Sequence, residues 1–250
     1  IETAHYIKGM HNLMSAHFDL RNYHKFNDTI CRFEAFTQTP TVLENQNNKI
    51  QTFIYLNLSK INRHFMEGTF EAGIAEIPQI EEKLTEYELY LDRHRVLVFY
   101  YKFASLYFGA GKYSTSIDYL NKVIDLKGDL RTDLRCYARL LHLIAHYELG
   151  NFEILEYLLK SVTRFMAKME NLGLAETEIF SFLKRSFRLQ PNELKPAFIK
   201  LLDNLKAIEK DKLASRAFMY LDVISWLESK IEGKEVQDII RDKYLRSINK

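Results

Sequence analysis

Arginine and histidine side chains recur at helical spacing between residues 131 and 146. Arg131, Arg135 and Arg139 are four residues apart, and His142 and His146 continue the series. Side chains three or four residues apart share one face of a helix. A row of guanidinium groups can hold phosphate or carboxylate groups, so Arg131, Arg135 and Arg139 are a candidate anion-binding or nucleic-acid-binding site.

This anion site has an alternative interpretation as a structural ionic network. Acidic residues between 81 and 88, in the preceding predicted hairpin, are possible partners for the arginines. A second basic row at Lys160, Arg164 and Lys168 favours anion binding. Such rows are also typical of a solvated helix face, so both interpretations stay open.

The two histidines have the spacing of a pair of metal ligands on one helix. However, Leu143 stands where the zinc-protease motif requires its catalytic glutamate, and no third ligand is evident. The sequence also contains no nucleophile elbow, no phosphate-binding loop and no paired catalytic carboxylates. We therefore predict no metal, no cofactor and no enzymatic activity.

The elements that must position these side chains are predicted to be helices. Apolar residues recur at helical spacing along the chain, and alternating strand patterns are nearly absent. Thr39 and Pro40 are predicted to open one long helix that ends near Glu67, as its N-cap and first residue. The last hairpin is predicted at residues 211–230 and 234–248. The fold class is therefore all-α, with about five antiparallel helical hairpins.

Three of the predicted turns share a glycine followed, two residues later, by an aromatic residue. These turns are Gly68-Thr69-Phe70, Gly111-Lys112-Tyr113 and Gly150-Asn151-Phe152, and the glycines are 43 and 39 residues apart. A period of this size is typical of helical solenoid repeats.

The unit at residues 100–123 resembles the tetratricopeptide repeat. It has aromatic residues, a small residue on its first helix, and small or aliphatic residues on its second: Tyr100, Tyr107, Tyr113, Ala104, Ser116, Leu120 and Val123. The resemblance extends over about residues 53–169, although the spacing exceeds the standard repeat of about 34 residues. It implies an α-solenoid with a right-handed superhelix, and one repeat domain over residues 1–250.

The resemblance also implies a concave groove, lined by the first helix of each hairpin, that usually holds a peptide or protein segment. On this geometry the groove residues are Tyr55, Leu58, Phe65, Tyr101, Phe108, Tyr137, Ile144 and Tyr147. They would suit an apolar peptide or an amphipathic helix. The alternative is that they are core residues, or that the chain itself fills the groove, because aromatic residues at helical spacing usually serve packing.

Composition limits the possible partners and the compartment. The chain has 250 residues and a net charge of +2, without the basic excess of a dedicated nucleic-acid binder, so nucleic acid is an unlikely partner. Two cysteines, Cys31 and Cys136, give neither a disulfide framework nor a CxxC site, which favours the cytoplasm. No apolar run is long enough to span a membrane. The sequence begins with Ile1, so we expect it to be part of a longer protein.

These observations predict a non-catalytic scaffold that binds another protein or a peptide segment. An anion-binding or nucleic-acid-binding module is the alternative, and a regulatory arm of a larger protein is a third possibility. The sequence does not predict the partner or the oligomeric state.

Overall fold

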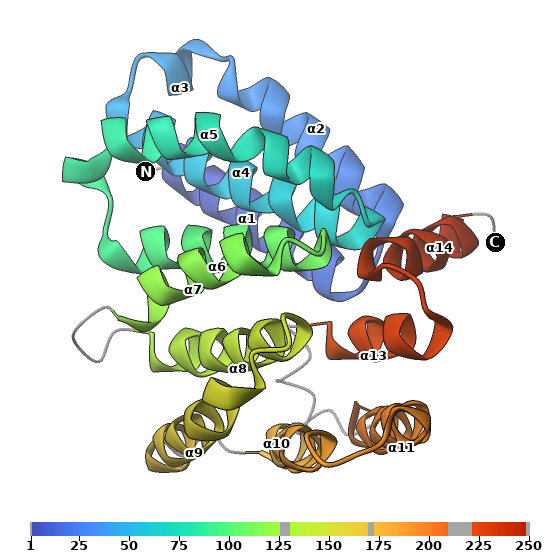
Figure 1. Ribbon diagram of the computed structural model, residues 1–250. Helices are drawn as coiled ribbons and strands as arrows, with labels where there is room; N and C mark the ends of the chain where they lie inside the picture. Colours follow the sequence, from blue (N-terminus) through green and yellow to red (C-terminus); the bar gives the residue numbers. More distant parts are fainter. Residues whose placement is uncertain (1, 126–130, 170–172, 210–221, 249–250) are drawn as a thin grey trace. The chain divides into compact units, whose positions relative to one another are not determined.

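The chain is built from helices and the turns that join them (Figure 1). The computed structural model describes residues 2–125, 131–169, 173–209 and 222–248, and no strand is present among them. This confirms the all-α prediction. Residues 1–99 with 240–250 form one compact unit, and residues 100–239 form another. We refer to them as unit 1 and unit 2, a division that the sequence did not predict.

Unit 1 contains the first helices of the chain. They are α1 (Glu2–Asp19), α2 (Tyr23–Thr37), α3 (Pro40–Leu43), α4 (Gln46–Glu67), α5 (Phe70–Glu86), the 3₁₀ helix η1 (Glu88–Tyr90) and the first part of α6 (Arg93–Gly109). Helices α1, α2 and α4 pack against one another. Their buried side chains form one core, which consists of Ile7, Met10, Met14, Phe26, Ile30, Phe33, Leu56 and Met66.

Unit 2 continues from the second part of α6. It contains α7 (Tyr113–Ile124), α8 (Thr132–Glu148), α9 (Phe152–Lys168), α10 (Leu174–Ser186), α11 (Pro191–Glu209), α13 (Val223–Glu232) and the start of α14 (Val236–Ile248). The boundary between the units therefore falls inside α6 and inside α14. Residues 211–221 of the last predicted hairpin lie outside the described residues, and α13 and α14 account for the rest of it.

Helix α4 does not begin where the sequence predicted. Pro40 opens only the short α3, and the hydroxyl of Thr39 donates to the carbonyl of Phe36 (2.8 Å) instead of capping a helix. The side chain of Asn45 accepts a hydrogen bond from the backbone N–H of Asn48 (3.0 Å) and opens α4. An asparagine cap satisfies one of the free N–H groups of a first helical turn, so the predicted long helix is two helices.

The three predicted glycine turns share one geometry. Gly68, Gly111 and Gly150 have φ of 68°, 72° and 69°, in the left-handed region that favours glycine. In each turn the N–H of the next residue bonds the carbonyl four positions before the glycine, at 2.8 to 3.1 Å. This is the Schellman ending of a helix, which lets the chain reverse into the next helix.

The turn between α1 and α2 is a fourth copy that the sequence analysis missed. Arg21 occupies the glycine position with φ of 51°, and the N–H of Asn22 bonds the carbonyl of His17 at 2.9 Å. Tyr23 then supplies the aromatic residue. An arginine in the left-handed region hides the motif from a search for glycine.

Two of these turns carry a histidine four residues before the glycine. His64 Nδ1 lies 2.7 Å from the hydroxyl of Thr69, and His146 Nδ1 lies 3.0 Å from the amide nitrogen of Asn151. In both turns the imidazole contacts the side chain that follows the glycine. These two histidines therefore close their turns with a hydrogen bond.

Candidate functional site

Four of the predicted groove residues are inside the chain. Tyr101, Phe108, Tyr137 and Ile144 are each at most 4% exposed. Side chains buried to this degree cannot contact an approaching peptide. These four side chains are therefore core residues, as in the alternative interpretation.

The burial of Tyr137 and Ile144 follows from the position of α8. This helix packs against α7 on one side and α9 on another, so its side chains are buried around most of its circumference. A helix that is apolar around most of its circumference is typically a central one. Helix α8 was predicted as the first helix of a hairpin, but these neighbours cover it, so it does not face an open groove.

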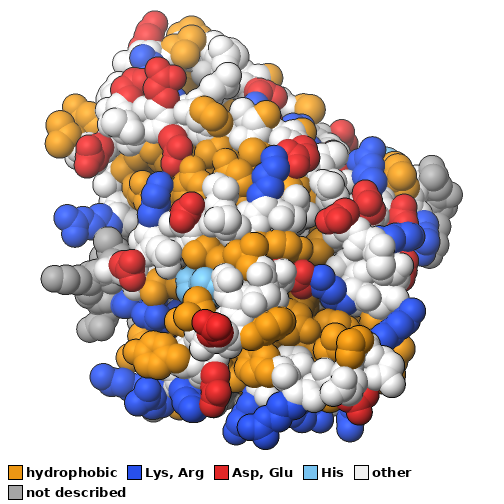
Figure 2. Space-filling view, in the orientation of Figure 1, with side chains coloured by type: hydrophobic (Ala, Val, Ile, Leu, Met, Phe, Trp, Pro, Cys, Tyr) orange, Lys and Arg blue, Asp and Glu red, His pale blue; other side chains and the backbone are white. Residues whose placement is uncertain are grey.

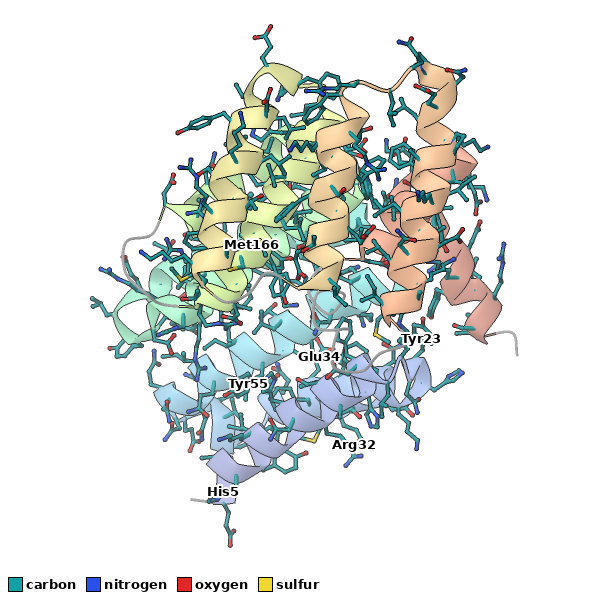
Figure 3. The ribbon with its side chains drawn as sticks, turned by 90° about the horizontal axis from the view of Figure 1, so that it is seen from below. His5, Tyr23, Arg32, Glu34, Tyr55 and Met166 are labelled. Atoms are coloured by element: carbon teal, nitrogen blue, oxygen red, sulfur yellow. The ribbon has the colours of Figure 1, made fainter. Side chains whose placement is uncertain are left out.

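The predicted groove residues of unit 1 are half-buried. Tyr55, labelled in Figure 3, packs against the core of this unit and stacks on the ring of His11 with 4.1 Å between ring centres. The guanidinium of Arg95 lies 5.5 Å from the Tyr55 ring. Burial, and then the charge of Arg95, lower the pKa of His11. Leu58 and Phe65 are also half-buried.

Tyr147 is half-buried in a cluster of aromatic rings in unit 2. Its ring centre lies 6.1 Å from that of Phe182, 6.4 Å from Phe198 and 6.3 Å from Trp226. Burial raises the pKa of Tyr147 to about 12. Because Phe182, Phe198 and Trp226 are buried, this cluster is part of the packing between α8, α10, α11 and α13.

The structure divides the predicted row of arginines, because Arg131 precedes α8 whereas Arg135 and Arg139 lie on it. Arg131 forms two hydrogen bonds with the carboxylate of Asp133, each 3.0 Å long. The pairing is local, with a residue two positions away, and differs from the predicted network with residues 81–88. Arg131 is therefore directed to a carboxylate of its own chain.

Arg135 and Arg139 both lie against the ring of Phe165 on α9. Their guanidinium carbons are 5.5 Å and 4.3 Å from the ring centre, within the range of cation–π contacts. Arg135 Nη2 also donates to the carbonyl of Ile124 at 3.5 Å. Burial, and then the nearby positive charge of Arg135, lower the pKa of Arg139.

His142 and His146 form a buried pair next to these arginines. Their Nε2 atoms are 3.3 Å apart, so one imidazole donates to the other. With the amide of Asn151 donating to His146 Nδ1, the proton of His146 is on Nε2, and His142 Nε2 is the acceptor. Burial, and then the charges of His146 and Arg139, lower the pKa of His142 to about 4. Both rings are neutral at neutral pH.

The paired histidines lack the further ligands of a metal centre. Among the residues that the structure describes, no three His, Cys, Asp or Glu side chains come together as a metal ion would require. The contacts that the pair does make are the hydrogen bond between the two rings and the one from Asn151 to His146.

Helix α9 exposes an apolar strip beside these arginines. Ile154, Leu158 and Phe165, with Ser161 between the last two, follow at intervals of four, three and four residues and so share one side of the helix. Ile154 is 47% exposed, and the other three are half-buried. Met166, labelled in Figure 3, is on the fully buried side of the same helix.

A row of exposed residues runs along α9 next to this strip. Tyr157, Lys160, Arg164 and Lys168 follow at intervals of three, four and four residues, and Tyr157 is 70% exposed. Lys160 pairs with Glu156 at 2.9 Å, and both side chains remain largely exposed. Figure 2 shows Lys and Arg side chains over α9 and α10 with hydrophobic side chains between them.

We call these residues together the α8–α9 face. It consists of the apolar strip Ile154, Leu158 and Phe165, bordered by Arg135 and Arg139 of α8 and by the outer row Tyr157, Lys160, Arg164 and Lys168 of α9. Sequence reasoning found the arginines and the three basic residues but missed the apolar residues. Their spacing was available in the sequence, but their exposure depends on which side of α9 meets its neighbours.

The described fold and this surface define an all-α protein with a mixed apolar and basic face. Comparisons with models of known protein families, with characterised proteins and with solved structures found no match to the chain. Within the described part of the chain, no helix combines the length and apolar character needed to cross a bilayer.

Proposed function

We propose that this chain is a non-catalytic scaffold of tetratricopeptide-like helical hairpins that binds a segment of another protein. The binding surface in this proposal is the α8–α9 face. It replaces the buried part of the predicted groove with residues that a partner can reach. Cys31 and Cys136 are both in the thiol form, which supports a reducing compartment such as the cytoplasm.

The observation that carries the proposal is the exposed apolar group at the start of α9. Another side of this helix already supplies its core residues, Leu155, Leu159 and Met166, which are buried. Ile154 and Tyr157 are not needed for that core, and each exposes about half or more of its surface. Single exposed apolar residues are ordinary, but a group beside a half-buried strip is typical of an interaction surface.

The helical frame supports the same function. Residues on a packed helix are held in place before a partner arrives, which lowers the ordering cost of binding a flexible segment. The repeated Schellman turns support the tetratricopeptide-like assignment. We infer from these features that the hairpins form a solenoid.

Anion or nucleic-acid binding is the second candidate, because two basic rows border the strip. Phosphate contacts displace counterions, so binding to a labelled 20-nucleotide RNA or DNA must weaken steeply as salt rises. A lack of binding at low salt would remove this candidate.

The proposal is tested by capture from a native lysate with a double variant. Ile154→Ala with Tyr157→Ala removes the most exposed apolar groups of the face and leaves its charges unchanged. We expect the captured proteins to fall by at least about tenfold, as for loss of two anchor residues. Quantitative mass spectrometry of the captured proteins measures this change.

The matched control is Leu89→Ala with Tyr90→Ala in η1. These residues are another exposed aliphatic and aromatic pair, at 93% and 65% exposure. Equal capture by the wild type and by the α9 variant, with unchanged helical content, would show that this face is not the binding surface.

A further inference from the structure

We infer that the segment bound at the α8–α9 face is an acidic amphipathic helix, with an apolar side flanked by Asp or Glu residues. This inference rests on the proposed function and adds the chemistry of the partner. It is argued from the charges on the two borders of the apolar strip.

The first border is the pair Arg135 and Arg139. Both guanidinium groups contact Phe165, the last residue of the strip, and each lies near the other's charge. The Nε of Arg139 is buried and has no hydrogen-bond partner among the described residues. A carboxylate brought to this border would offset the repulsion between the two like charges.

The second border is the outer row of α9. Lys160, Arg164 and Lys168 place three positive charges along about two turns of helix, parallel to the strip. Acidic groups are also present near the face: Glu156 pairs with Lys160, and the charge of Asp125 acts on Arg139. These groups and Glu153, in the first turn of α9, offset part of the charge, but among the described residues the Lys and Arg side chains named here still outnumber the Asp and Glu side chains on each border.

The apolar strip fixes the class of macromolecule. Ile154 and Leu158 are aliphatic and gain most from contact with other apolar side chains, which a sugar-phosphate backbone does not supply. Phe165 is eleven positions after Ile154, a length of about 16.5 Å at 1.5 Å per residue. Three turns of an amphipathic helix, with apolar residues at positions i, i+4, i+7 and i+11, match that length.

The test is a selection of random 16-residue peptides displayed on phage, with the wild-type chain as bait. We expect enrichment of peptides that combine Leu, Ile, Phe or Trp at helical spacing with Asp or Glu. A synthetic, fluorescein-labelled copy of the leading peptide is then titrated at two salt concentrations. Its binding should weaken with salt, because the flanking ion pairs are solvent-exposed.

Charge reversal on α9 gives the decisive comparison. The triple variant Lys160→Glu, Arg164→Glu and Lys168→Glu should bind the selected acidic peptide at least about tenfold more weakly. The matched control, Lys8→Glu, Lys25→Glu and Arg32→Glu, makes the same charge change on exposed residues of α1 and α2 and should bind like the wild type. Circular dichroism checks that both variants are folded.

Each other outcome has a distinct meaning. Two outcomes would overturn the acidic partner and leave the proposed function standing. In the first, the enriched peptides are apolar and carry no acidic residues. In the second, they bind the triple α9 variant as well as the wild type but do not bind Ile154→Ala with Tyr157→Ala. A selection that enriches no peptide dependent on Ile154 and Tyr157 would overturn both. Binding of a labelled 20-nucleotide RNA that is lost in the α9 variant, without peptide binding, would identify a nucleic-acid surface instead.

Discussion

The carboxylate of Glu148, at the end of α8, joins side chains from distant parts of unit 2. It accepts a hydrogen bond from Trp226 Nε1 (2.7 Å) and pairs with the ammonium of Lys230. Its charge also contributes, after burial, to the raised pKa of Tyr113. The Glu148 side chain is only 5% exposed, so its two oxygens depend on these partners.

Replacing Glu148 with Gln should therefore destabilise unit 2. The amide keeps one acceptor for Trp226 but leaves Lys230 without its counter-charge. Because Lys230 remains about one-third exposed, we expect a loss of about 2 kcal/mol in the free energy of unfolding. Urea titration followed by the fluorescence of Trp226, the only tryptophan of the chain, measures the loss.

A control for this substitution lies on the same helix as Trp226. Glu232 pairs with Lys234 on the surface, where both side chains are more than 40% exposed. Glu232→Gln should change stability by less than about 0.5 kcal/mol, as exposed ion pairs usually do. Equal effects of the two substitutions would contradict a structural role for the buried carboxylate.

His142 should make the stability of the protein depend on pH. Its pKa is about 4 in the folded chain and about 6.5 when unfolded, so unfolding takes up a proton between these values. The neutral imidazole therefore makes its full contribution to the free energy of unfolding above about pH 6.5. This contribution falls as pH decreases and is lost below about pH 4. The loss is on the order of 3 kcal/mol, at 1.36 kcal/mol per pKa unit.

The measurement is the unfolding free energy of wild type and His142→Gln from pH 7.5 to pH 4. The difference between the two curves isolates His142 from carboxylates that titrate in the same range. His24→Gln, at an exposed residue, serves as the control. Curves for wild type and His142→Gln that stay parallel over the whole range would refute the prediction.

At the scale of the elements, helix ends are determined by short local patterns. The glycine turns were predicted correctly because a glycine followed, two residues later, by an aromatic residue is a local signal. The start of α4 was not, since Thr39 and Asn45 are both good N-cap residues and only the structure shows that Thr39 bonds Phe36. Local sequence patterns therefore predict that a helix ends, but they do not distinguish between two candidate N-cap residues.

The turn between α1 and α2 offers a test of this local logic. Arg21 is exposed and holds φ of 51°, which costs a non-glycine residue about 1 to 2 kcal/mol. Glycine removes this cost but makes the unfolded chain more flexible. We therefore expect Arg21→Gly to stabilise the protein by about 0.5 to 1 kcal/mol, measured by thermal and urea unfolding.

The reverse substitution should have the opposite sign. Gly150 has φ of 69°, and a Cβ there would meet only the edge of Phe152 at 3.8 Å, an ordinary contact. The loss for Gly150→Ala, about 1 kcal/mol, would therefore come from the backbone alone. If Arg21→Gly destabilised the protein, the left-handed backbone at Arg21 would not be what limits the stability of its turn.

At the scale of the whole molecule, the two compact units share two continuous helices. The boundary falls between residues 99 and 100 in α6 and between residues 239 and 240 in α14. Backbone hydrogen bonds of a helix connect residues four apart, so each shared helix continues across the boundary. Helix formation is cooperative, and loss of one part weakens the next.

We therefore expect the two units to unfold together. Trp226 fluorescence reports on unit 2 alone, and far-ultraviolet circular dichroism reports on the helices of both units. Their urea midpoints should coincide, as in a two-state transition. Two separated transitions in circular dichroism, of which fluorescence follows only one, would show that the shared helices do not couple the units.

The sequence by itself determined the helices and most of their turns. Helical periodicity, glycine positions and the aromatic residues that follow are read from neighbours within a few positions, and the backbone geometry that they favour is the same in any surroundings. The same locality identified the basic residues of α8 and α9 as rows on their helices.

Only the tertiary structure decided what those rows face. Tyr137 and Ile144 are buried because α7 and α9 cover α8, and the ring of Phe165 receives Arg135 and Arg139 because α9 packs beside them. Burial is a property of the contact between two helices, and residues on one helix do not encode which side its neighbour will cover. The apolar strip of α9 was therefore visible as a pattern in the sequence but became a surface only in the fold.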